Sequence, residues 1–445
     1  MPKKKTALTI EERLQQALVP AEEQPYEVPE NWVWVRLGEI NKYVSKSVNP
    51  INEPDKIFEL YSVPSMADDY PEIIAGSDIG SSKQSVCKED VLLCKINPRI
   101  NRVWKVSQFT DNELIASSEW IIIRNNHINA NYLMYCFQSK YFREFMLSNV
   151  SGVGGSLMRA QPKYVQTYPI PLPPLSEQQR IVERIEELFA KLDEAKERLQ
   201  EVADSFAVRK AAILHKAFTG ELTKQWRREN GVSDASWVEK TIGDVCIVNP
   251  KKIDAKNLDD NLEVSFVPMA AVSDVFGEIV NHEVKNLQDV RTGFTNFSEG
   301  DVIFAKITPC MENGKSAIVG PLVNDIGYGS TEFYVLRCKE ELYNKYLYHM
   351  VRNTTFRAEA KAVMTGAVGQ QRVPKTFLQE YQLLLPSLPE QHEIVRLIDE
   401  LLARERAAQQ AAEQALASID LMKKSILARA FRGELGTNKA SEASA

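Results

Sequence analysis

Apolar residues recur at alternating spacings of four and three in two long stretches of the chain, a pattern that predicts coiled-coil helices. In the first stretch, these positions are Ile181, Ile185, Leu188, Leu192, Ala195, Leu199, Val202 and Phe206. In the second stretch, they are Ile394, Ile398, Leu401, Ala408, Ala412, Ala415, Ile419, Met422 and Ile426. Because small residues let helices approach closely, we expect the alanine-rich second helix to pack against the first. At ~1.5 Å per residue, about 40 residues would give antiparallel rods roughly 60 Å long.

Local signals mark the ends of these helices. Ser176 follows two prolines and is predicted to be an N-cap, with Gln179 placed to complete a capping box. Gly220 is predicted to end the first helix. Glu405 interrupts the apolar seam of the second helix.

The two helical stretches belong to a longer internal repeat. The stretch "PLPPLSEQQRIVERIEEL" recurs as "LLPSLPEQHEIVRLIDEL", where Glu177-Gln178 matches Glu390-Gln391. At the same offset, "ILHKAFTGEL" matches "ILARAFRGEL", and Glu119 of "SSEWIIIR" matches Glu332 of "STEFYVLR". At a slightly smaller offset, "EDVLLCKINP" matches "GDVIFAKITP". The chain therefore contains two copies of one unit, each a domain followed by a long helix.

The rest of each copy alternates short apolar runs, typical of strands, with more helical segments. This pattern predicts an α+β protein, with two mixed α/β domains joined by two long antiparallel coiled-coil helices in a pseudo-twofold internal repeat. We expect a helical extension at 1–30, a first domain at 31–172, a helical spacer at 173–232, a second domain at 233–385, a second spacer at 386–435 and a disordered tail at 436–445. Pseudo-twofold symmetry would place the opening segment around Leu14 near the C-terminal end around Leu435.

Composition narrows the class of protein. The chain has 445 residues, too many for one ordinary domain, and its 44% hydrophobic and 26% charged residues are typical of soluble globular proteins. Its six cysteines form no C-x-x-C pair, which favours reduced thiols over a zinc site or disulfides. The start "MPKKKTALTIEER" is basic but no apolar core follows it, so we do not expect it to be a signal peptide, and no apolar run approaches the ~20 residues of a membrane helix. We therefore predict a cytoplasmic protein without contact to a membrane.

The sequence lacks the usual motifs of catalysis. Gly314-Lys315-Ser316 resembles the end of a phosphate-binding loop, but Pro309 stands where that loop needs its first glycine. We interpret this segment as a turn between strands. No G-x-G-x-x-G occurs, and the five histidines form no H-E-x-x-H or nucleophile motif. We predict no catalytic site, no metal site and no cofactor in this chain.

Charge is distributed unevenly although the net charge is only −6. Residues 83–105 have six basic and two acidic side chains, whereas residues 177–204 have nine acidic and five basic ones. Each domain also has a polar glycine segment before its helix, "SGVGGSLMRAQPK" and "TGAVGQQRVPK". Basic side chains suit phosphates and glutamines suit base edges, so these regions are candidates for DNA binding. Chance variation of surface charge, and flexible connectors before the helices, remain alternatives.

The candidate DNA-binding residues come from the basic span, the glycine segments and the two matched strand ends. They are Lys95, Arg99, Arg102, Lys105, Arg159, Lys163, Lys306, Lys315, Gln370, Gln371, Arg372 and Lys375. We expect an Arg372→Ala substitution to weaken binding chiefly to one half-site.

Two variable domains, each followed by an "LPPLSEQ"-like entry and a long helix ending in "AF-x-GEL", resemble the specificity subunit of Type I restriction-modification systems. The resemblance extends over nearly the whole chain. It implies that each domain reads one half of a split, asymmetric sequence in double-stranded DNA, with the paired helices as a ruler. It also implies that the helices dock two methyltransferase subunits, which bring S-adenosylmethionine, and that restriction subunits join for cleavage that uses ATP and Mg²⁺.

Two other classes of function stay open. A coiled-coil scaffold could use its end domains to bind protein or another ligand, and an enzyme could use motifs that are not recognisable. Sequence-dependent, salt-sensitive binding to duplex DNA would distinguish the DNA reader from the scaffold. Catalysis by the purified chain alone would support the enzyme.

Overall fold

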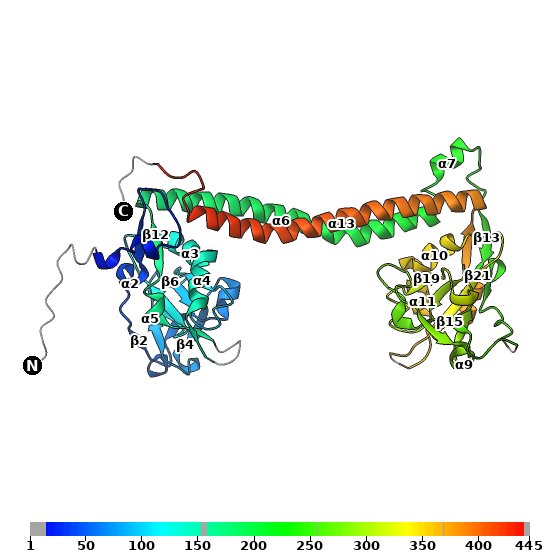
Figure 1. Cartoon of the computed structure of the whole chain (residues 1–445), viewed down its shortest axis with the longest axis horizontal. Coiled ribbons are helices and arrows are strands. Elements are labelled where there is room, and N and C mark those ends of the chain that lie inside the picture. Colours follow the sequence, from blue (N-terminus) through cyan, green and yellow to red (C-terminus); the bar gives the residue numbers. More distant parts are fainter. Residues whose placement is uncertain (1–14, 153–157, 256, 368, 440–445) are drawn as a thin grey trace, which may run out of the picture. The chain divides into compact units, whose positions relative to one another are not determined.

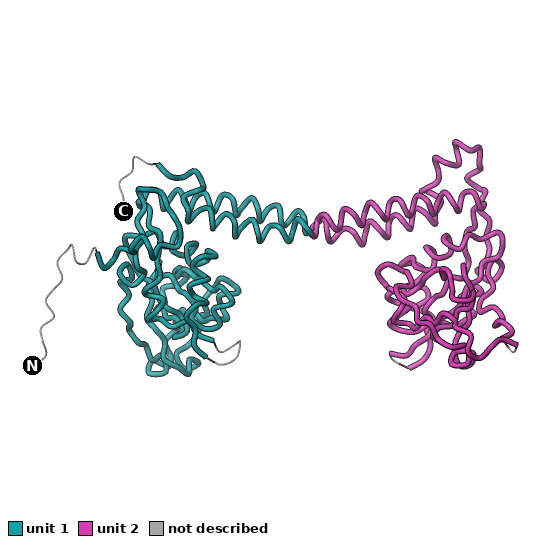
Figure 2. The backbone as a smooth tube through the Cα atoms, in the orientation of Figure 1, with its two compact units in different colours: residues 1–200, 414–445 teal, residues 201–413 magenta. Residues whose placement is uncertain are grey.

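The computed structural model describes residues 15–152, 158–255, 257–367 and 369–439. The chain divides into two compact units, residues 1–200 with 414–445 and residues 201–413 (Figure 2). Two long helices, α6 (Leu175–Phe218) and α13 (Leu388–Ala430), each contribute one end to each unit. The apolar seam and the internal repeat predicted two mixed domains combined with two long helices. The α+β fold of both units confirms this prediction (Figure 1).

Unit 1 has a small sheet sandwiched between helices and a larger sheet. The three-stranded sheet has the order β7 (Val103–Lys105), β6 (Val91–Cys94), β9 (Trp120–Ile123), and the five-stranded sheet has the order β2 (Ser47–Val48), β5 (Lys83–Ser85), β8 (Glu113–Ala116), β3 (Ile57–Tyr61), β4 (Glu72–Ala75). Val91 and Leu93 pack against α3 (Ala130–Gln138) and α4 (Lys140–Ser148), whereas Leu92 and Cys94 face the larger sheet. Burial on both faces explains why this strand is a continuous apolar run.

Unit 2 repeats this layered arrangement. One sheet has the order β14 (Cys246–Val248), β21 (Phe333–Cys338), β18 (Val302–Ala305), β19 (Ser316–Ile318), and the other has the order β16 (Glu283–Asn286), β15 (Glu263–Val267), β20 (Gly327–Gly329), β17 (Thr295–Phe297). Val302 and Phe304 face α10 (Asn344–Arg352) and α11 (Thr354–Ala362), and Ile303 and Ala305 face the second sheet. The parallel pair β3–β8 of unit 1 has its counterpart in β15–β20.

Shorter elements complete each domain. In unit 1 they are β1 (Val33–Arg36), α2 (Leu37–Ile40), β10 (Val150–Ser151), β11 (Arg159–Ala160), α5 (Pro162–Val165) and β12 (Pro169–Leu172). In unit 2 they are α7 (Lys224–Glu229), β13 (Val238–Thr241), α8 (Ile242–Val245), α9 (Leu287–Val290), α12 (Lys375–Glu380) and β22 (Gln382–Leu385). The pairs β1–β12 and β13–β22 are antiparallel and join the first strand of each domain to the strand before its helix.

Within each unit, the start of one long helix packs against the end of the other. Ile181 and Ile185 of α6 are fully buried in one core with Leu427 of α13. Ile394 and Ile398 of α13 are fully buried with Leu214 of α6. The remaining predicted packing residues are placed as follows: Ile419 is buried, and Leu188, Leu192, Leu199 and Leu401 are half-buried. The helices therefore run antiparallel, and their first turns belong to the domain cores.

The helical prediction is wrong in two respects. Helix α6 begins at Leu175, because the carbonyl of Pro174 accepts the N–H groups of Glu177 and Gln178, so Ser176 lies inside the helix and is not its N-cap. Val202 and Met422 are 43% and 50% exposed and do not lie in the seam, and the predicted seam residues Ala195 and Ala408 are exposed as well. Beside Met422, Lys423 takes the contact position instead, with its ammonium 5.1 Å from the Phe189 ring centre.

The repeated Glu-Gln pair is buried at the start of each long helix. Glu177 accepts hydrogen bonds from Trp32 and Asn438, both at 2.9 Å, and Glu390 accepts from Thr223 at 2.7 Å and Arg227 at 2.6 Å. The side-chain amides of Gln178 and Gln391 donate to the carbonyls of Pro173 and Pro386. Each glutamate thus joins its helix to the segment that follows the end of the other helix.

The described part of the opening segment contacts the C-terminal end. The Arg432 guanidinium lies 5.3 Å from the Tyr26 ring centre, and a Cβ on Gly433, which has a φ of 75°, would collide with Pro29. Leu14 itself lies outside the described residues. Residues 437–439 were predicted as part of a disordered tail but are held in place, because Asn438 donates to Asn31 at 2.8 Å and to Glu177.

Across the described ranges, no helix is long and apolar enough to cross a membrane. In the same ranges, no three or more His, Cys, Asp or Glu side chains gather in a group that could hold a metal ion.

Candidate nucleic-acid interface

The segment after β18 and the glycine segment before α12 meet in unit 2. The N–H of Thr308 donates to the carbonyl of Gln371 at 3.0 Å, and the N–H of Val373 donates to the carbonyl of Lys306 at 2.9 Å. The N–H of Lys306 in turn donates to the carbonyl of Glu332, at 2.9 Å. We call residues 306–309 and 370–373, together with Glu332, loop cluster 2. Three motifs that are far apart in the sequence thus form one surface.

Unit 1 has the same arrangement. The N–H of Asn97 donates to the carbonyl of Met158 at 2.7 Å, the N–H of Ala160 donates to the carbonyl of Lys95 at 2.8 Å, and the N–H of Lys95 donates to the carbonyl of Glu119 at 3.0 Å. We call residues 95–97 and 158–160, together with Glu119, loop cluster 1. Residues 153–157 of its glycine segment lie outside the described residues.

An arginine–glutamate ion pair holds each cluster. Arg372 contacts Glu332 through two nitrogens, at 2.9 and 2.8 Å, and Arg159 contacts Glu119 in the same way, at 3.2 and 3.1 Å. Such bidentate pairs fix orientation as well as distance. The Arg372 guanidinium lowers the pKa of Glu332, so this carboxylate is charged at neutral pH. Both arginines are less than half exposed, so they secure the loops rather than extend freely toward a ligand.

The two clusters share the same backbone hydrogen bonds and the same Arg–Glu pair, which together we call their frame. The side chains that this frame presents differ. Gln371 and Met158 make equivalent backbone hydrogen bonds at matching positions of the repeat, yet one offers an amide and the other a thioether. Amides recognise hydrogen-bonding base edges, whereas apolar groups contact thymine methyls. The two clusters therefore present different chemistry in one geometry.

The other predicted DNA-binding residues are distributed around these clusters. Arg99, Lys163, Gln370 and Lys375 are exposed, and the Lys163 ammonium lies 4.7 Å from the ring centre of its neighbour Tyr164.

Lys306 lies within loop cluster 2, with its ammonium 5.1 Å from the Tyr334 ring centre. Burial, together with Arg372, lowers the pKa of Lys306, although Glu332 opposes this.

Two predicted cations have local partners. Lys105 pairs with Glu89 at 3.6 Å, and Lys315 donates to the carbonyl of Met269 at 3.1 Å. Gly314 has a φ of 79° and precedes β19, as expected of a turn between strands rather than a phosphate-binding loop.

A cleft of about 530 Å³ lies beside loop cluster 1. Lys83 and Arg102 line it together with Asn97, Ser117 and Glu119. Asp90, one of the two acids in this basic span, is buried and pairs with Arg124 at 2.6 Å, so it does not neutralise these lysines and arginines. Leu60, Val63, Pro64 and Ile96 form most of the rest of its wall, so the cleft is largely apolar with two cations and a few polar groups.

The partners of the two arginines were not predicted from the sequence. Glu119 and Glu332 were recognised as repeat markers, but not as the residues that hold Arg159 and Arg372. One and the same offset separates the two glutamates and the two arginines. Two opposite charges that recur at one offset were a signal of an ion pair in each copy.

Comparisons with known proteins identify the family of the chain. A family model described as "Type I restriction modification DNA specificity domain" matches residues 29–204 and 235–415. The EcoAI and EcoEI specificity subunits of Type I restriction enzymes from Escherichia coli are 38% and 35% identical over 185 residues, which is 41% of this chain but only 30% of theirs. The StySPI specificity subunit from Salmonella potsdam is 25% identical over 69% of this chain and 66% of its own length.

Solved structures share the fold. The crystal structure of the HsdS subunit from Thermoanaerobacter tengcongensis superposes with a TM-score of 0.67 at 22% identity, covering 93% of this chain and 99% of that chain. A chain from a structure entitled "Structural basis underlying complex assembly and conformational transition of the type I R-M system" gives 0.67 at 21% identity, covering 92% of this chain and 100% of its own.

Proposed function

This chain belongs to the Type I restriction-modification DNA specificity family, and we propose that each of its two domains reads one half of a bipartite, asymmetric DNA target. The first reader lies within residues 31–172 and the second within residues 233–385. The chain performs no bond-making chemistry itself, since it is the non-catalytic specificity subunit of such a system. It selects the site at which partner subunits act.

The observation that supports this proposal most is the pair of loop clusters. A common frame, closed by the pairs Arg159–Glu119 and Arg372–Glu332, presents Met158 in one domain and Gln371 in the other. Equivalent frames favour the same approach to DNA, and unlike side chains favour different bases. Two readers of this kind would recognise an asymmetric sequence.

The candidate residues then divide by role. Gln370 and Gln371 suit base edges, whereas Lys163, Lys306 and Lys375 suit phosphates. Arg372 is bound to Glu332, so its substitution would act through the shape of loop cluster 2. We now expect Arg372→Ala to weaken recognition of the second domain's half-site by releasing Gln371, and Arg372→Lys, which cannot make a bidentate pair, to have a similar effect.

The long helices would provide the contacts to partner subunits. Residues 177–204 of α6 have an excess of acidic side chains, and much of this segment is exposed. We propose that the helices dock two methyltransferase subunits, which bring S-adenosylmethionine and flip the target adenine out of the duplex. Restriction subunits would join this complex and use ATP and Mg²⁺. The helices would also set the gap between the half-sites.

The test is to co-express this chain with the methyltransferase encoded beside it and to map methylated adenines along the host genome. We expect one asymmetric, two-part motif with a fixed gap. The Arg372→Ala variant should degrade recognition of one half of this motif and leave the other half unchanged. No methylation, with the partner shown to be folded and bound, would refute the proposal and favour a scaffold with ligand-binding end domains.

A further inference from the structure

Four cationic side chains converge in unit 2, and among the described residues no carboxylate lies within ion-pair distance of them. They are Lys210 of α6, Arg352 of α10, Arg357 of α11 and Arg406 of α13. In the part of the chain that the structure describes, none of the four forms an ion pair. We call these residues the unit 2 basic cluster. A charge cluster of this kind costs free energy in the folded protein unless something compensates it.

Neutral carbonyl groups position two of these cations. Arg352 donates to the carbonyl of Gly314 at 2.7 Å and to that of Asp274 at 3.0 Å. Arg357 donates to the carbonyl of Arg352 at 3.2 Å and also to that of Glu312. Carbonyl contacts fix the guanidinium groups in place but leave their full positive charges.

The four groups repel one another. Burial lowers the pKa of Lys210, and the neighbouring charges of Arg352, Arg406 and Arg357 lower it further. Burial likewise lowers the pKa values of Arg352 and Arg357; for Arg352, Tyr348 and Asp274 oppose this shift while Arg406 adds to it, and for Arg357, Arg352 adds to it. Since Lys210 and Arg406 also keep part of their surface in contact with solvent, an anion from solution can reach the cluster and relieve this repulsion.

The internal repeat supplies a comparison within the same molecule. At the offset that relates the two long helices, Lys210 corresponds to Lys423, and Arg406 corresponds to Asp193. In unit 1 these two positions form an ion pair at 2.5 Å. In the domain helices the repeat runs at an offset one residue larger, since the N–H groups of Asn129 and Tyr343 both donate to the glutamine of the repeated Glu-Gln pair. Arg352 and Arg357 therefore correspond to Gln138 and Arg143, and Arg143 donates to the carbonyl of Arg99 as Arg357 does to that of Glu312. The fold accepts a balanced pair at the positions of Lys210 and Arg406, and the additional positive charge of unit 2 arises at Arg352 and Arg406.

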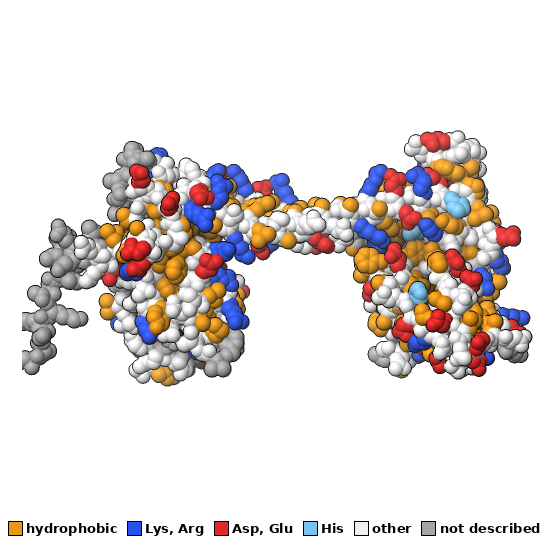
Figure 3. Space-filling view, viewed as in Figure 1, with side chains coloured by type: hydrophobic (Ala, Val, Ile, Leu, Met, Phe, Trp, Pro, Cys, Tyr) orange, Lys and Arg blue, Asp and Glu red, His pale blue; other side chains and the backbone are white. Residues whose placement is uncertain are grey.

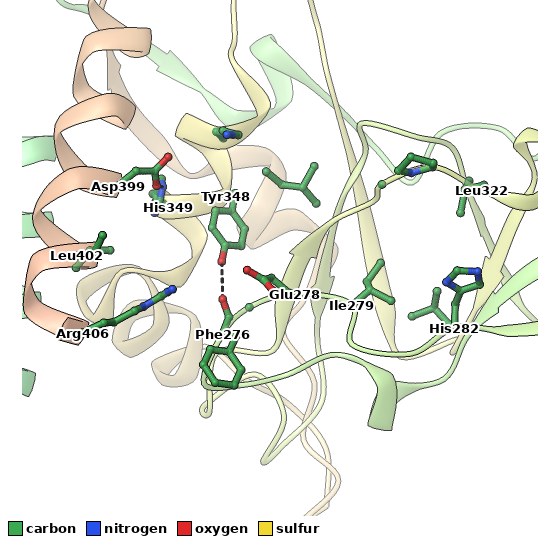
Figure 4. A pocket seen from close by; sticks show the side chains of 17 residues that line it. Phe276, Glu278, Ile279, His282, Leu322, Tyr348, His349, Asp399, Leu402 and Arg406 are labelled. Carbon is green, nitrogen blue, oxygen red and sulfur yellow. Dashed lines mark hydrogen bonds and ion pairs between the residues drawn. The ribbon is translucent and has the colours of Figure 1, made fainter. Parts of the chain in front are cut away.

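The cluster adjoins both a pocket and loop cluster 2. Arg406 extends from α13 into a pocket of about 690 Å³, where it lies with Phe276 and Tyr348 (Figure 4). Lys and Arg side chains gather where α13 crosses unit 2 (Figure 3). The segment 306–315 begins in loop cluster 2, and its other end is held by Arg352 and Arg357. One continuous segment thus connects the proposed reading loops with the basic cluster.

We propose that the unit 2 basic cluster binds the phosphate backbone of duplex DNA beside the half-site read by the second domain. This inference rests on the proposed function and adds a specific contact surface to it. Phosphate contacts position a protein on the duplex and release counterions, but they do not read bases. The cluster therefore adds affinity for DNA of any sequence and anchors the duplex while loop cluster 2 recognises its bases.

The test uses the complex of this chain with its methyltransferase and two variants. Arg406→Asp installs the unit 1 residue, so an ion pair with Lys210 is expected and folding is preserved. Lys210→Ala together with Arg406→Ala removes two charges without adding an acid. The matched control is Lys224→Ala with Arg228→Ala, which removes two exposed cations of α7 in the same unit. Affinities for target and random duplexes are measured across a range of salt concentrations.

Both cluster variants should lose affinity for target and random duplex by the same factor. The slope of log affinity against log salt should fall by about 0.9 for each phosphate that the protein no longer neutralises. The methylated motif and the control variant should be unchanged. If affinity and slope are unchanged in both variants while the wild-type complex still prefers its target, the inference is overturned but the proposed function is not.

Three other outcomes also decide the question. Loss on the target duplex only would overturn the inference by making these residues base readers. A wild-type complex without sequence preference would overturn the proposed function itself. If inorganic phosphate raises the Tm of the wild type but not of Arg406→Asp, while the salt slope on DNA is unchanged, the site binds a small anion and the assignment to DNA is wrong.

Discussion

The buried ion pair between Arg227 and Glu390 provides a quantitative test of how each unit is closed. Glu390 is fully buried and Arg227 is 6% exposed, and their nearest nitrogen and oxygen atoms are 2.6 Å apart. The same carboxylate oxygen of Glu390 accepts from Thr223 at 2.7 Å. The pair joins the start of α13 to the segment that follows α6. Its loss should therefore open this junction.

Replacing Arg227 with Met keeps the length of the side chain and makes its end apolar. The buried carboxylate of Glu390 then has Thr223 as its remaining donor. Breaking one side of a buried pair costs about 3–5 kcal/mol, because the remaining charge stays desolvated. The further ion pair with the exposed Asp234, at 3.0 Å, adds less than about 1 kcal/mol. A loss of about 4 kcal/mol is roughly a thousandfold increase in the opening equilibrium.

Hydrogen–deuterium exchange of peptides that cover α7 and the first turns of α13 measures this opening directly. Adding Glu390→Gln to Arg227→Met removes the stranded charge and keeps an acceptor for Thr223, so the double variant should regain more than half of the loss. Arg404→Met breaks an exposed pair with Glu400 on the same helix and should cost less than about 1 kcal/mol. An Arg227→Met effect as small as that of the control, or no recovery in the double variant, would refute the reasoning.

Three further predictions concern the core, the reading loop and pH. Ile398→Ala, at a fully buried position, should lower the free energy of unfolding in urea by about 2–5 kcal/mol. Leu421→Ala, at a position 65% exposed, should lower it little. Equal losses would contradict the assignment of Ile398 to the core. Gln370→Ala should change the bases preferred in one half-site without changing the salt slope of DNA binding, and a lower slope would instead make Gln370 a phosphate contact. The hydrogen bond from His349 lowers the pKa of Asp399 below its usual 3.8, so the stabilisation by this carboxylate is present above that value and lost as pH falls below it. The stability difference between wild type and Asp399→Asn, measured as Tm, should shrink from about pH 5 to about pH 2, and a constant difference would exclude this ionisation as its source.

The helical part of the fold was predictable because its determinants are local. The spacing of Ile181 and Ile185, and of Ile394 and Ile398, indicates the face of each helix that is buried. The prediction failed at Met422, where the long side chain of Lys423 reaches over the Phe189 ring to pair with Asp193. A pattern of apolar residues does not predict that the aliphatic part of a lysine side chain will occupy a contact position between two helices.

The sheets were not predictable beyond the existence of strands. Strand β3 pairs with β8 in parallel, so that Phe58 lies beside Glu113. Nothing in two short apolar runs specifies which distant run is the partner, because many pairings bury a similar surface. The internal repeat implies that both domains have the same strand pairing, and β15 and β20 do form the same parallel pair. One pairing would therefore have predicted the other.

The candidate residues were selected from the sequence, but the contacts that hold two of them were not predicted. Arg159 and Arg372 were selected as cations for DNA, and the structure places both in the loop clusters, where glutamates hold them. Their positive charge was visible in the sequence, whereas their commitment to a carboxylate depends on the tertiary fold. A candidate cation therefore needs its partners identified before it can be assigned to a phosphate.

The way in which the loop clusters are closed would explain how one scaffold could serve the two proposed readers. A bidentate Arg–Glu pair and backbone hydrogen bonds fix the path of the loop, and neither depends on the side chains that the loop presents. The carbonyl groups of Met158 and Gln371 accept equivalent hydrogen bonds, at 2.7 and 3.0 Å, although their side chains differ completely. If the clusters contact DNA as proposed, a substitution at such a position would change the chemistry offered to DNA while the frame remains. Specificity could then change within either domain without refolding it.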